Sequence, residues 1–145
     1  MNDKTRGIDS VGVVILKDGK ILLVREEEAS QKLTGMYGLP AGKVEPGEPL
    51  KKTAKRELEE ETGLVAELND VKEFDGNYFE AEVDLKKLGH KYFFWTVFKV
   101  GKFSGELRPS DATTPGWYSM EELEDLDREG KLLPNNLAAV KNSIS

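Results

Sequence analysis

The segment that decides the fold is residues 42–64, with the sequence GKVEPGEPLKKTAKRELEEETGL. Its second half predicts a helix over residues 49–62, because apolar side chains recur every four residues and form one stripe. The stripe consists of Leu50, Ala54 and Leu58. Pro49 suits the first helical turn, where a missing N–H costs no hydrogen bond. Gly63 suits a left-handed C-cap that ends the helix.

Three glutamates share one face of this predicted helix. Glu57, Glu60 and Glu61 stand at positions i, i+3 and i+4, which places their Cβ atoms about 5–6 Å apart. Carboxylates this close repel one another, and a hard divalent cation such as Mg²⁺ or Mn²⁺ removes the repulsion. Several glycines before the helix let backbone approach a ligand: Gly35, Gly38, Gly42 and Gly47. The combination favours metal-assisted chemistry on a phosphate group, although glutamates alone are also typical of a solvated helix face.

Upstream of this segment, the sequence predicts a β-hairpin. Two β-rich runs, residues 11–16 and 21–24, flank the pair Asp18-Gly19, which supplies the positive φ angles of a tight turn. Residues 25–38 are polar and irregular, and we expect a loop there.

Downstream, we expect three strands, at residues 65–74, 92–100 and 117–119. The middle one is a nearly continuous run of aromatic and β-branched residues, as is typical of a central strand. Ser119 and Glu122 have the spacing of a capping box, which predicts a helix from Met120. A last helix is expected from about 135 to 143. The fold class is therefore α/β (α+β), with a mixed β-sheet.

Composition narrows the class of protein. The 145 residues predict a single domain over 1–145. The net charge of −6 disfavours non-specific binding to a nucleic acid polymer or an anionic membrane. The absence of cysteine excludes disulfides, thiolate zinc sites and cysteine nucleophiles. Residues 1–10 have no apolar signal core, and no apolar run approaches the roughly 20 residues of a membrane helix. We expect a cytoplasmic protein.

The spacing within residues 42–64 is Gly-x5-Glu-x7-Arg-Glu-aliphatic-x-Glu-Glu-x-Gly-aliphatic. This pattern resembles the complete Nudix box. The resemblance implies an α/β/α sandwich with a mixed β-sheet and a box that forms a loop, a helix and a loop. It also implies Mg²⁺-dependent hydrolysis of a nucleoside diphosphate linked to another group, with Mn²⁺ as an alternative ion.

The resemblance also implies roles for residues of the box. Glu57, Glu60 and Glu61 would be the metal ligands, and Glu57 is the usual candidate for positioning or deprotonating the attacking water. The Ala41 carbonyl would be a further metal ligand. Arg56 would pair with and orient Glu57. Two further expectations concern the framework: a structural role for Glu48, and turn positions for Gly42, Gly47 and Gly63.

Outside the box, three residues are candidate substrate contacts. Asp111 stands six residues before Trp117. In MutT-like members of the family, an acidic residue at this position often completes the metal site or acts as the base; a solvated loop aspartate is the alternative. Asn136, shortly after Pro134, matches a base-reading asparagine of the same subgroup, and capping of the last helix by Asn135 or Asn136 is the alternative. Arg25 would contact phosphate, unless it is a surface arginine.

Two other conspicuous side chains have structural interpretations. We expect His90, the only histidine, on the surface, and Trp95 in the core. The favoured function is a MutT-like hydrolase of nucleoside triphosphates, and a homodimer is expected. Alternative substrates are ADP-ribose, other nucleotide sugars and diadenosine polyphosphates. Family members that hydrolyse ADP-ribose carry a proline after the box, and because no proline occurs here between Leu64 and Pro109, ADP-ribose ranks lower. A nucleotide-sensing module and a purely structural domain are the competing classes.

Overall fold

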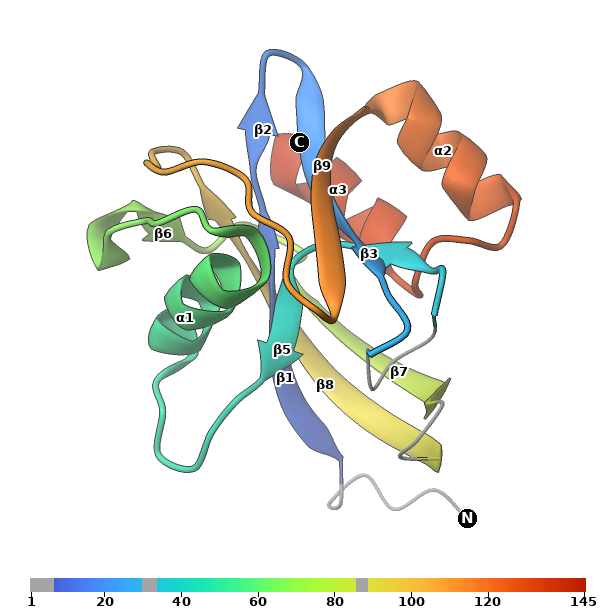
Figure 1. The fold of residues 1–145 in the computed structure, drawn as a ribbon. Helices are drawn as coiled ribbons and strands as arrows, with labels where there is room; N and C mark the ends of the chain where they lie inside the picture. The colour runs from blue at the N-terminus through green and yellow to red at the C-terminus, as the bar shows by residue number, and fades with distance from the viewer. Residues whose placement is uncertain (1–6, 30–33, 86–88) are drawn as a thin grey trace.

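The computed structural model describes residues 7–29, 34–85 and 89–145. Figure 1 shows three layers, with one helix on one side of the strands and two on the other. The single helix is α1 (Leu50–Thr62), and the pair is α2 (Met120–Arg128) and α3 (Asn136–Ile144). The expected α/β/α sandwich with a mixed sheet is confirmed.

The strands form two sheets. The first has the order β5-β1-β8-β6, with β7 also paired to β8; only β1 and β8 run parallel, so this sheet is mixed. Its strands are β1 (Ile8–Val14), β5 (Ala41–Lys43), β6 (Val71–Lys72), β7 (Tyr78–Leu85) and β8 (Gly89–Val100). The second sheet is antiparallel and pairs β3 with three neighbours. Its strands are β2 (Leu16–Lys17), β3 (Lys20–Glu26), β4 (Tyr37–Gly38) and β9 (Thr113–Ser119).

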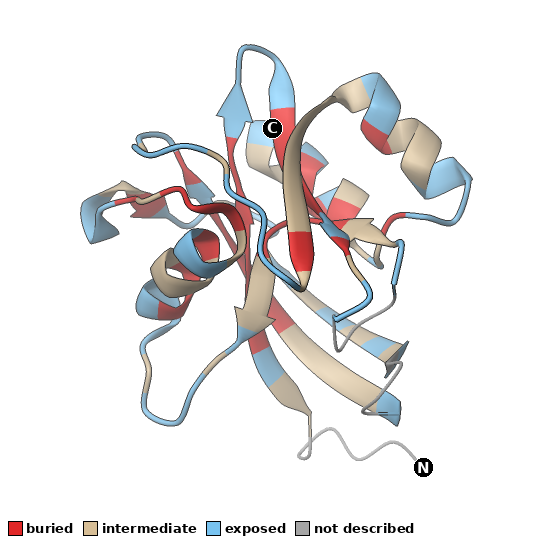
Figure 2. Cartoon of the chain, in the orientation of Figure 1, coloured by how far each residue is buried: buried red, intermediate tan, exposed pale blue. Residues whose placement is uncertain are grey.

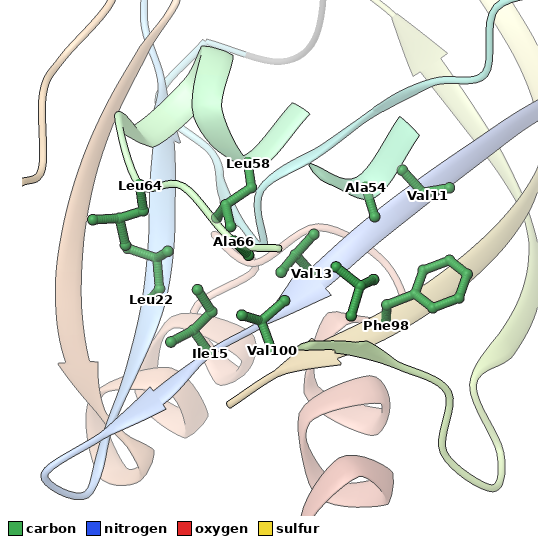
Figure 3. Close-up of a cluster of buried hydrophobic side chains, with 11 residues drawn as sticks. Val11, Val13, Ile15, Leu22, Ala54, Leu58, Leu64, Ala66, Phe98 and Val100 are labelled. Carbon is green, nitrogen blue, oxygen red and sulfur yellow. The ribbon is translucent and has the colours of Figure 1, made fainter. Parts of the chain in front are cut away.

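Alternation along β1 and β3 divides the core into two clusters, one on each face of the strands. Val11, Val13 and Ile15 pack with Ala54 and Leu58 of α1 (Figure 3). The other cluster lies against α2 and α3 and contains Val14, Ile21, Leu23, Trp95, Val97, Leu123, Ala139 and Val140. In Figure 2 the buried residues gather where the strands pass between the helices. The position of α1 is therefore fixed by Ala54 and Leu58, whereas Leu50, the third residue of the predicted stripe, is exposed at the start of the helix and lies outside the core.

The predicted hairpin is confirmed at its turn and at the pairing of Leu16 with Ile21, but it is shorter than expected. Asp18 and Gly19 adopt φ angles of 51° and 76°, as the turn requires. Across this turn, however, β3 pairs with the short strand β2 and not with β1. β1 leaves the hairpin and pairs with β8 and β5, because its apolar residues are covered on both faces and suit the interior of a larger sheet.

The region after α1 differs most from expectation. Residues 65–74 do not form one strand: Leu68–Asp70 is a short 3-10 helix, and only Val71–Lys72 pairs with β8. Asn69 and Asp70 favour turns because their side chains compete for backbone hydrogen bonds. β7 was not predicted, although its alternation of apolar and acidic residues is the pattern of a half-buried strand.

The remaining expectations agree more closely with the structure. β8 lies inside its sheet, as predicted for the 92–100 run, and the capping box at Ser119 and Glu122 starts α2 at Met120. β9 is longer than the predicted 117–119 strand. The expected loop over residues 25–38 is shorter, because its first residues belong to β3 and its last residues to β4. Residues 30–33 of this loop lie outside the described residues, as do residues 1–6 of the polar N-terminus. In the described part of the chain, no helix is long and apolar enough to span a membrane.

The α1 stripe yields a stability prediction. Leu58 is fully buried, whereas Leu50 on the same helix is 39% exposed. Leu58→Ala is expected to lower the free energy of unfolding by about 2–5 kcal/mol through lost burial and a cavity. Leu50→Ala is expected to change it by about 0.5 kcal/mol or less. Urea unfolding followed by circular dichroism measures both, and equal losses would contradict the assigned orientation of α1.

Candidate active site

Arg56 is the hub of the side-chain network on α1. Its Nε and Nη2 donate to the two carboxylate oxygens of Glu48, each at 2.9 Å, a bidentate geometry. Its Nη1 donates to Glu57 at 2.7 Å and to both oxygens of Glu60 at 3.3 Å. Nη2 also donates to the Lys43 carbonyl at 3.1 Å. One guanidinium thus ties the loop before α1, strand β5 and two of the three candidate ligands together.

Glu48 anchors this network from the loop. Besides Arg56, it accepts a hydrogen bond from the Thr53 hydroxyl at 2.7 Å and one from the backbone N–H of Glu45 at 3.1 Å. The hydrogen bonds from Arg56, and then from Thr53, lower the pKa of Glu48 from 4.5 to about 2. Reciprocally, Glu48 raises the pKa of Arg56 above its already high value. The expected structural role of Glu48 agrees with these contacts.

Glu57 and Gly42 occupy one tightly packed position. Gly42 lies in extended β5, and a methyl group added to it would overlap the carboxyl group of Glu57. The expectation that Gly42 serves a turn is therefore wrong: this glycine is needed for close approach of a side chain. Gly47 and Gly63 do have positive φ angles, 75° and 84°, and serve turns as expected.

Glu61 joins the end of α1 to both sheets. Its Oε1 accepts a hydrogen bond from the Ala41 backbone N–H at 2.7 Å. Its backbone carbonyl accepts one from the hydroxyl of Thr113 in β9, at 3.2 Å. Thr113 and Thr53 were not singled out from the sequence; both are polar residues at buried positions, and no motif marks them.

The three candidate ligands lie along one helix face, as their spacing predicts. Glu57 is mostly buried, with 13% of its side chain exposed, whereas 57% of the Glu60 side chain is exposed. Among the described residues, no three carboxylate or imidazole groups converge closely enough to hold a metal ion. Of the candidate ligands, Glu57 and Glu60 accept hydrogen bonds from Arg56, and Glu61 accepts one from the Ala41 N–H. The donor set is nonetheless composed of oxygen atoms, which fits a hard divalent cation.

A largely apolar cavity of about 320 Å³ adjoins this face through β5. Ala41, Gly42 and Lys43 line it on one side, and Phe93 and Trp95 of β8 on another. Trp95 is thus a core residue, as expected, and also a wall of the cavity. Further lining residues come from β1, β7 and the start of α3: Ile8, Ser10, Ala81, Val83, Pro134, Asn135 and Asn136.

Asn136 lies in this cavity wall with its amide engaged by backbone. Its Oδ1 accepts from the Leu39 N–H at 2.7 Å, and its Nδ2 donates to the carbonyls of Leu133 and Pro134 at 3.2 and 2.9 Å. Both amide hydrogens are therefore used, and only a second lone pair of Oδ1 is left for another group. Asn135 occupies the N-cap position of α3, but its side chain makes no capping hydrogen bond.

The other candidates lie outside the Arg56 network. Asp111 is exposed in the loop before β9. The first residue of β9, Thr113, contacts α1 through the Glu61 carbonyl. Arg25 is paired with Glu27 at 2.8 Å. His90 is exposed, as expected, between Asp84 and Glu82 of β7 at 2.7 and 3.2 Å, and these carboxylates raise its pKa, Asp84 most strongly.

Comparison with known proteins extends the resemblance over most of the chain. Residues 8–137 match the family model described as the NUDIX domain. The chain is 36% identical over 102 residues to the ADP-ribose pyrophosphatase of Methanocaldococcus jannaschii, covering 70% of this chain and 55% of that protein. It is 30% identical over 115 residues to the CTP pyrophosphohydrolase of Escherichia coli, covering 79% and 78%. It thus spans about half the length of the first relative and most of the second.

A solved structure shows the same architecture. The MutT NUDIX hydrolase from Burkholderia pseudomallei has a TM-score of 0.72 to this chain and is 27% identical to it. The comparison covers 94% of this chain and 97% of that protein. The similarity therefore includes both helical layers and the strands between them.

The packing of Gly42 predicts a selective effect on metal binding. Gly42→Ala is expected to displace the Glu57 carboxyl group and weaken Mg²⁺ or Mn²⁺ binding about 10–100-fold, the range seen when the support of a ligand is lost. Gly101→Ala is the matched control, since a methyl group there meets nothing within 4 Å. Calorimetric titration with each ion measures the effect. Unchanged affinity in Gly42→Ala would show that this contact does not position a ligand.

The Glu48–Arg56 pair predicts a pH dependence of stability. Because folding lowers the pKa of Glu48 from 4.5 to about 2, its ionised form stabilises the folded state above pH 4.5, and this stabilisation is lost as the pH falls toward 2. Glu48→Gln should therefore flatten the loss of unfolding free energy across that window, measured by urea unfolding at several pH values. Glu45→Gln, an exposed neighbour without an Arg56 contact, should keep the wild-type slope. Equal slopes in wild type and Glu48→Gln would contradict the assignment.

Proposed function

Because this chain belongs to the Nudix family, we propose that it is a metal-dependent pyrophosphohydrolase that cleaves a phosphoanhydride bond in a nucleoside diphosphate or triphosphate derivative. The relatives carry names of this kind: one is an ADP-ribose pyrophosphatase and another a CTP pyrophosphohydrolase. The partner is then a small nucleotide rather than a nucleic acid polymer or a membrane. A homodimer remains a prediction for sedimentation measurements.

One observation carries the proposal: strand β5 is shared by two features. Gly42 packs against the Glu57 carboxyl group and the Ala41 N–H binds Glu61, while the same strand lines the apolar cavity. A nucleoside in the cavity would therefore place its phosphates beside the carboxylates of α1. An apolar, aromatic-walled cavity with a few polar groups is the usual form of a small-molecule site.

The roles proposed for individual residues follow from their contacts. Glu57, Glu60 and Glu61, with the Ala41 carbonyl, would hold Mg²⁺, with Mn²⁺ as the alternative. The bound cation would neutralise phosphate charge and lower the pKa of the attacking water. Arg56 would orient Glu57 and Glu60 through its hydrogen bonds to their carboxylates, and Glu57 would accept a proton from the attacking water.

The residues outside the box have more limited proposed roles. Asp111 is a candidate further carboxylate, supported by the link from its loop through Thr113 to α1. Asn136 would shape the nucleoside cavity and offer only an acceptor, since both of its amide hydrogens bind backbone. Arg25 has a weaker case as a phosphate contact because Glu27 already pairs with it.

The substrate class is tested by a panel of nucleotides with and without Mg²⁺. The panel holds canonical and oxidised nucleoside triphosphates, ADP-ribose, other nucleotide sugars, diadenosine polyphosphates and NADH. Phosphate release is measured after pyrophosphatase treatment, or after phosphatase treatment for diphosphate-linked compounds. We expect metal-dependent cleavage, with a MutT-like preference for nucleoside triphosphates. Tight nucleotide binding with no metal-dependent turnover across the panel would favour a sensing module instead.

A single substitution tests the proposed metal site. Glu60→Gln keeps the size of the side chain but removes a charged ligand, so metal-dependent kcat is expected to fall at least about 100-fold with the fold intact. Glu67→Gln is the control, an exposed glutamate beyond the helix. Initial rates and circular dichroism are measured for both. Near-normal turnover in Glu60→Gln would remove this residue from the metal site.

A further inference from the structure

The outer face of α1 carries an open hollow of about 630 Å³, separate from the apolar cavity. Four cationic side chains line it, namely Lys52, Lys55, Arg56 and Arg108, against two acidic ones, Glu59 and Glu60. The exposed side chain of Leu68 also contributes. This local excess of positive charge is opposite in sign to the chain, whose net charge is −6. Counted over its lining side chains, the hollow therefore carries more positive than negative charges, on a protein whose net charge is negative.

The cations of this hollow differ in how far their charge is already compensated. Arg56 is engaged by Glu48, Glu57 and Glu60. Lys55 donates to the Ala66 carbonyl at 2.7 Å and keeps two further N–H groups. Within the described ranges, Lys52 and Arg108 form no ion pair. Among the described residues, three lining cations therefore have no carboxylate ion-pair partner: Lys52, Lys55 and Arg108.

Arg108 is held in place by its backbone. Its N–H donates to the Thr62 carbonyl at 2.8 Å, and its Cβ lies so close to Gly63 that a methyl group there would be 3.0 Å away. Lys52 projects from the first turns of α1, on a rigid helix. Lys52 is consequently presented near the start of α1 and Arg108 beside its end, and Lys55 and Leu68 line the same hollow.

We propose that this hollow binds the phosphate groups of an oligophosphate. Arg56 and Glu60 belong both to the lining of the hollow and to the carboxylate network, so the hollow begins where the proposed active site ends. The apolar cavity, the carboxylates and the hollow follow one another across β5 and α1. The phosphates belong either to the distal part of the substrate or to a free oligophosphate that acts as an effector. The first of these sources rests on the proposed function.

Binding is tested without catalysis. Tripolyphosphate is titrated into the full chain by calorimetry in metal-free buffer with EDTA, for wild type, Lys52→Gln, Arg108→Gln and the double variant. Each substitution is expected to weaken binding about tenfold, the value of one charge-assisted hydrogen bond. Glu59→Gln should strengthen it by removing repulsion, and binding should weaken with added salt. Lys141→Gln, on α3, is the matched control. No binding, or equal affinity in all variants, would overturn the proposal.

Kinetics distinguish the two sources. If the hollow takes the distal phosphates of the substrate, Lys52→Gln and Arg108→Gln raise KM for nucleoside triphosphates or longer polyphosphates, with kcat retained and with no change for a diphosphate-linked sugar nucleotide. If it takes a free oligophosphate, KM is unchanged and the effect of added tripolyphosphate on the rate is lost in the variants. Should no substrate be hydrolysed at all, the proposed function fails while the calorimetric result still decides the binding site.

Discussion

The interaction on which the candidate site depends is the set of hydrogen bonds made by Arg56. A single helix that carries three neighbouring carboxylates is destabilised by their repulsion. Arg56 compensates two of them directly and is itself fixed by the bidentate pair with Glu48. Glu48 in turn is fixed by Thr53 of the same helix. These hydrogen bonds therefore fix the loop before α1 relative to the helix, and they also fix the positions of the Glu57 and Glu60 carboxylates.

Core packing of α1 against the strands supports this network. Ala54 and Leu58 press α1 onto β1 and β3, and this packing brings the adjacent helix face against β5. At that contact the absence of a side chain on Gly42 matters more than any conformational freedom, because the Glu57 carboxyl group fills the space. Core packing on one face of α1 and an oxygen-rich site on the next face are consequences of a single 3.6-residue period.

Local patterns predicted much of this molecule. The box helix, its Gly63 cap, the turn at Asp18 and the capping box of α2 depend on neighbours in sequence, and all agree with the structure. The shared face of the glutamates follows from helical spacing alone. The separation of β1 from β3 could not be deduced this way, because strand partners are set by contacts with β8, distant in sequence.

The same limit applies to single residues of the site. The role of Gly42 depends on Glu57, fifteen positions later, and the hydrogen bonding of Asn136 depends on Leu39, 97 positions earlier. Motif spacing identifies such residues without indicating what they contact. β7 is different, since its alternating pattern was visible in the sequence and could have been found.

The assignment of the metal site to α1 and β5 is tested most directly by locating the bound cation. Substoichiometric Mn²⁺ added to ¹⁵N-labelled protein broadens backbone amide signals according to their distance from the bound ion. We expect the amide signals of residues 41–43 and 56–61 to broaden first and those of β7 to stay unaffected. Broadening centred on Glu82, Asp84 and His90 instead, with α1 and β5 unchanged, would contradict the assignment of the metal site to the Arg56 network.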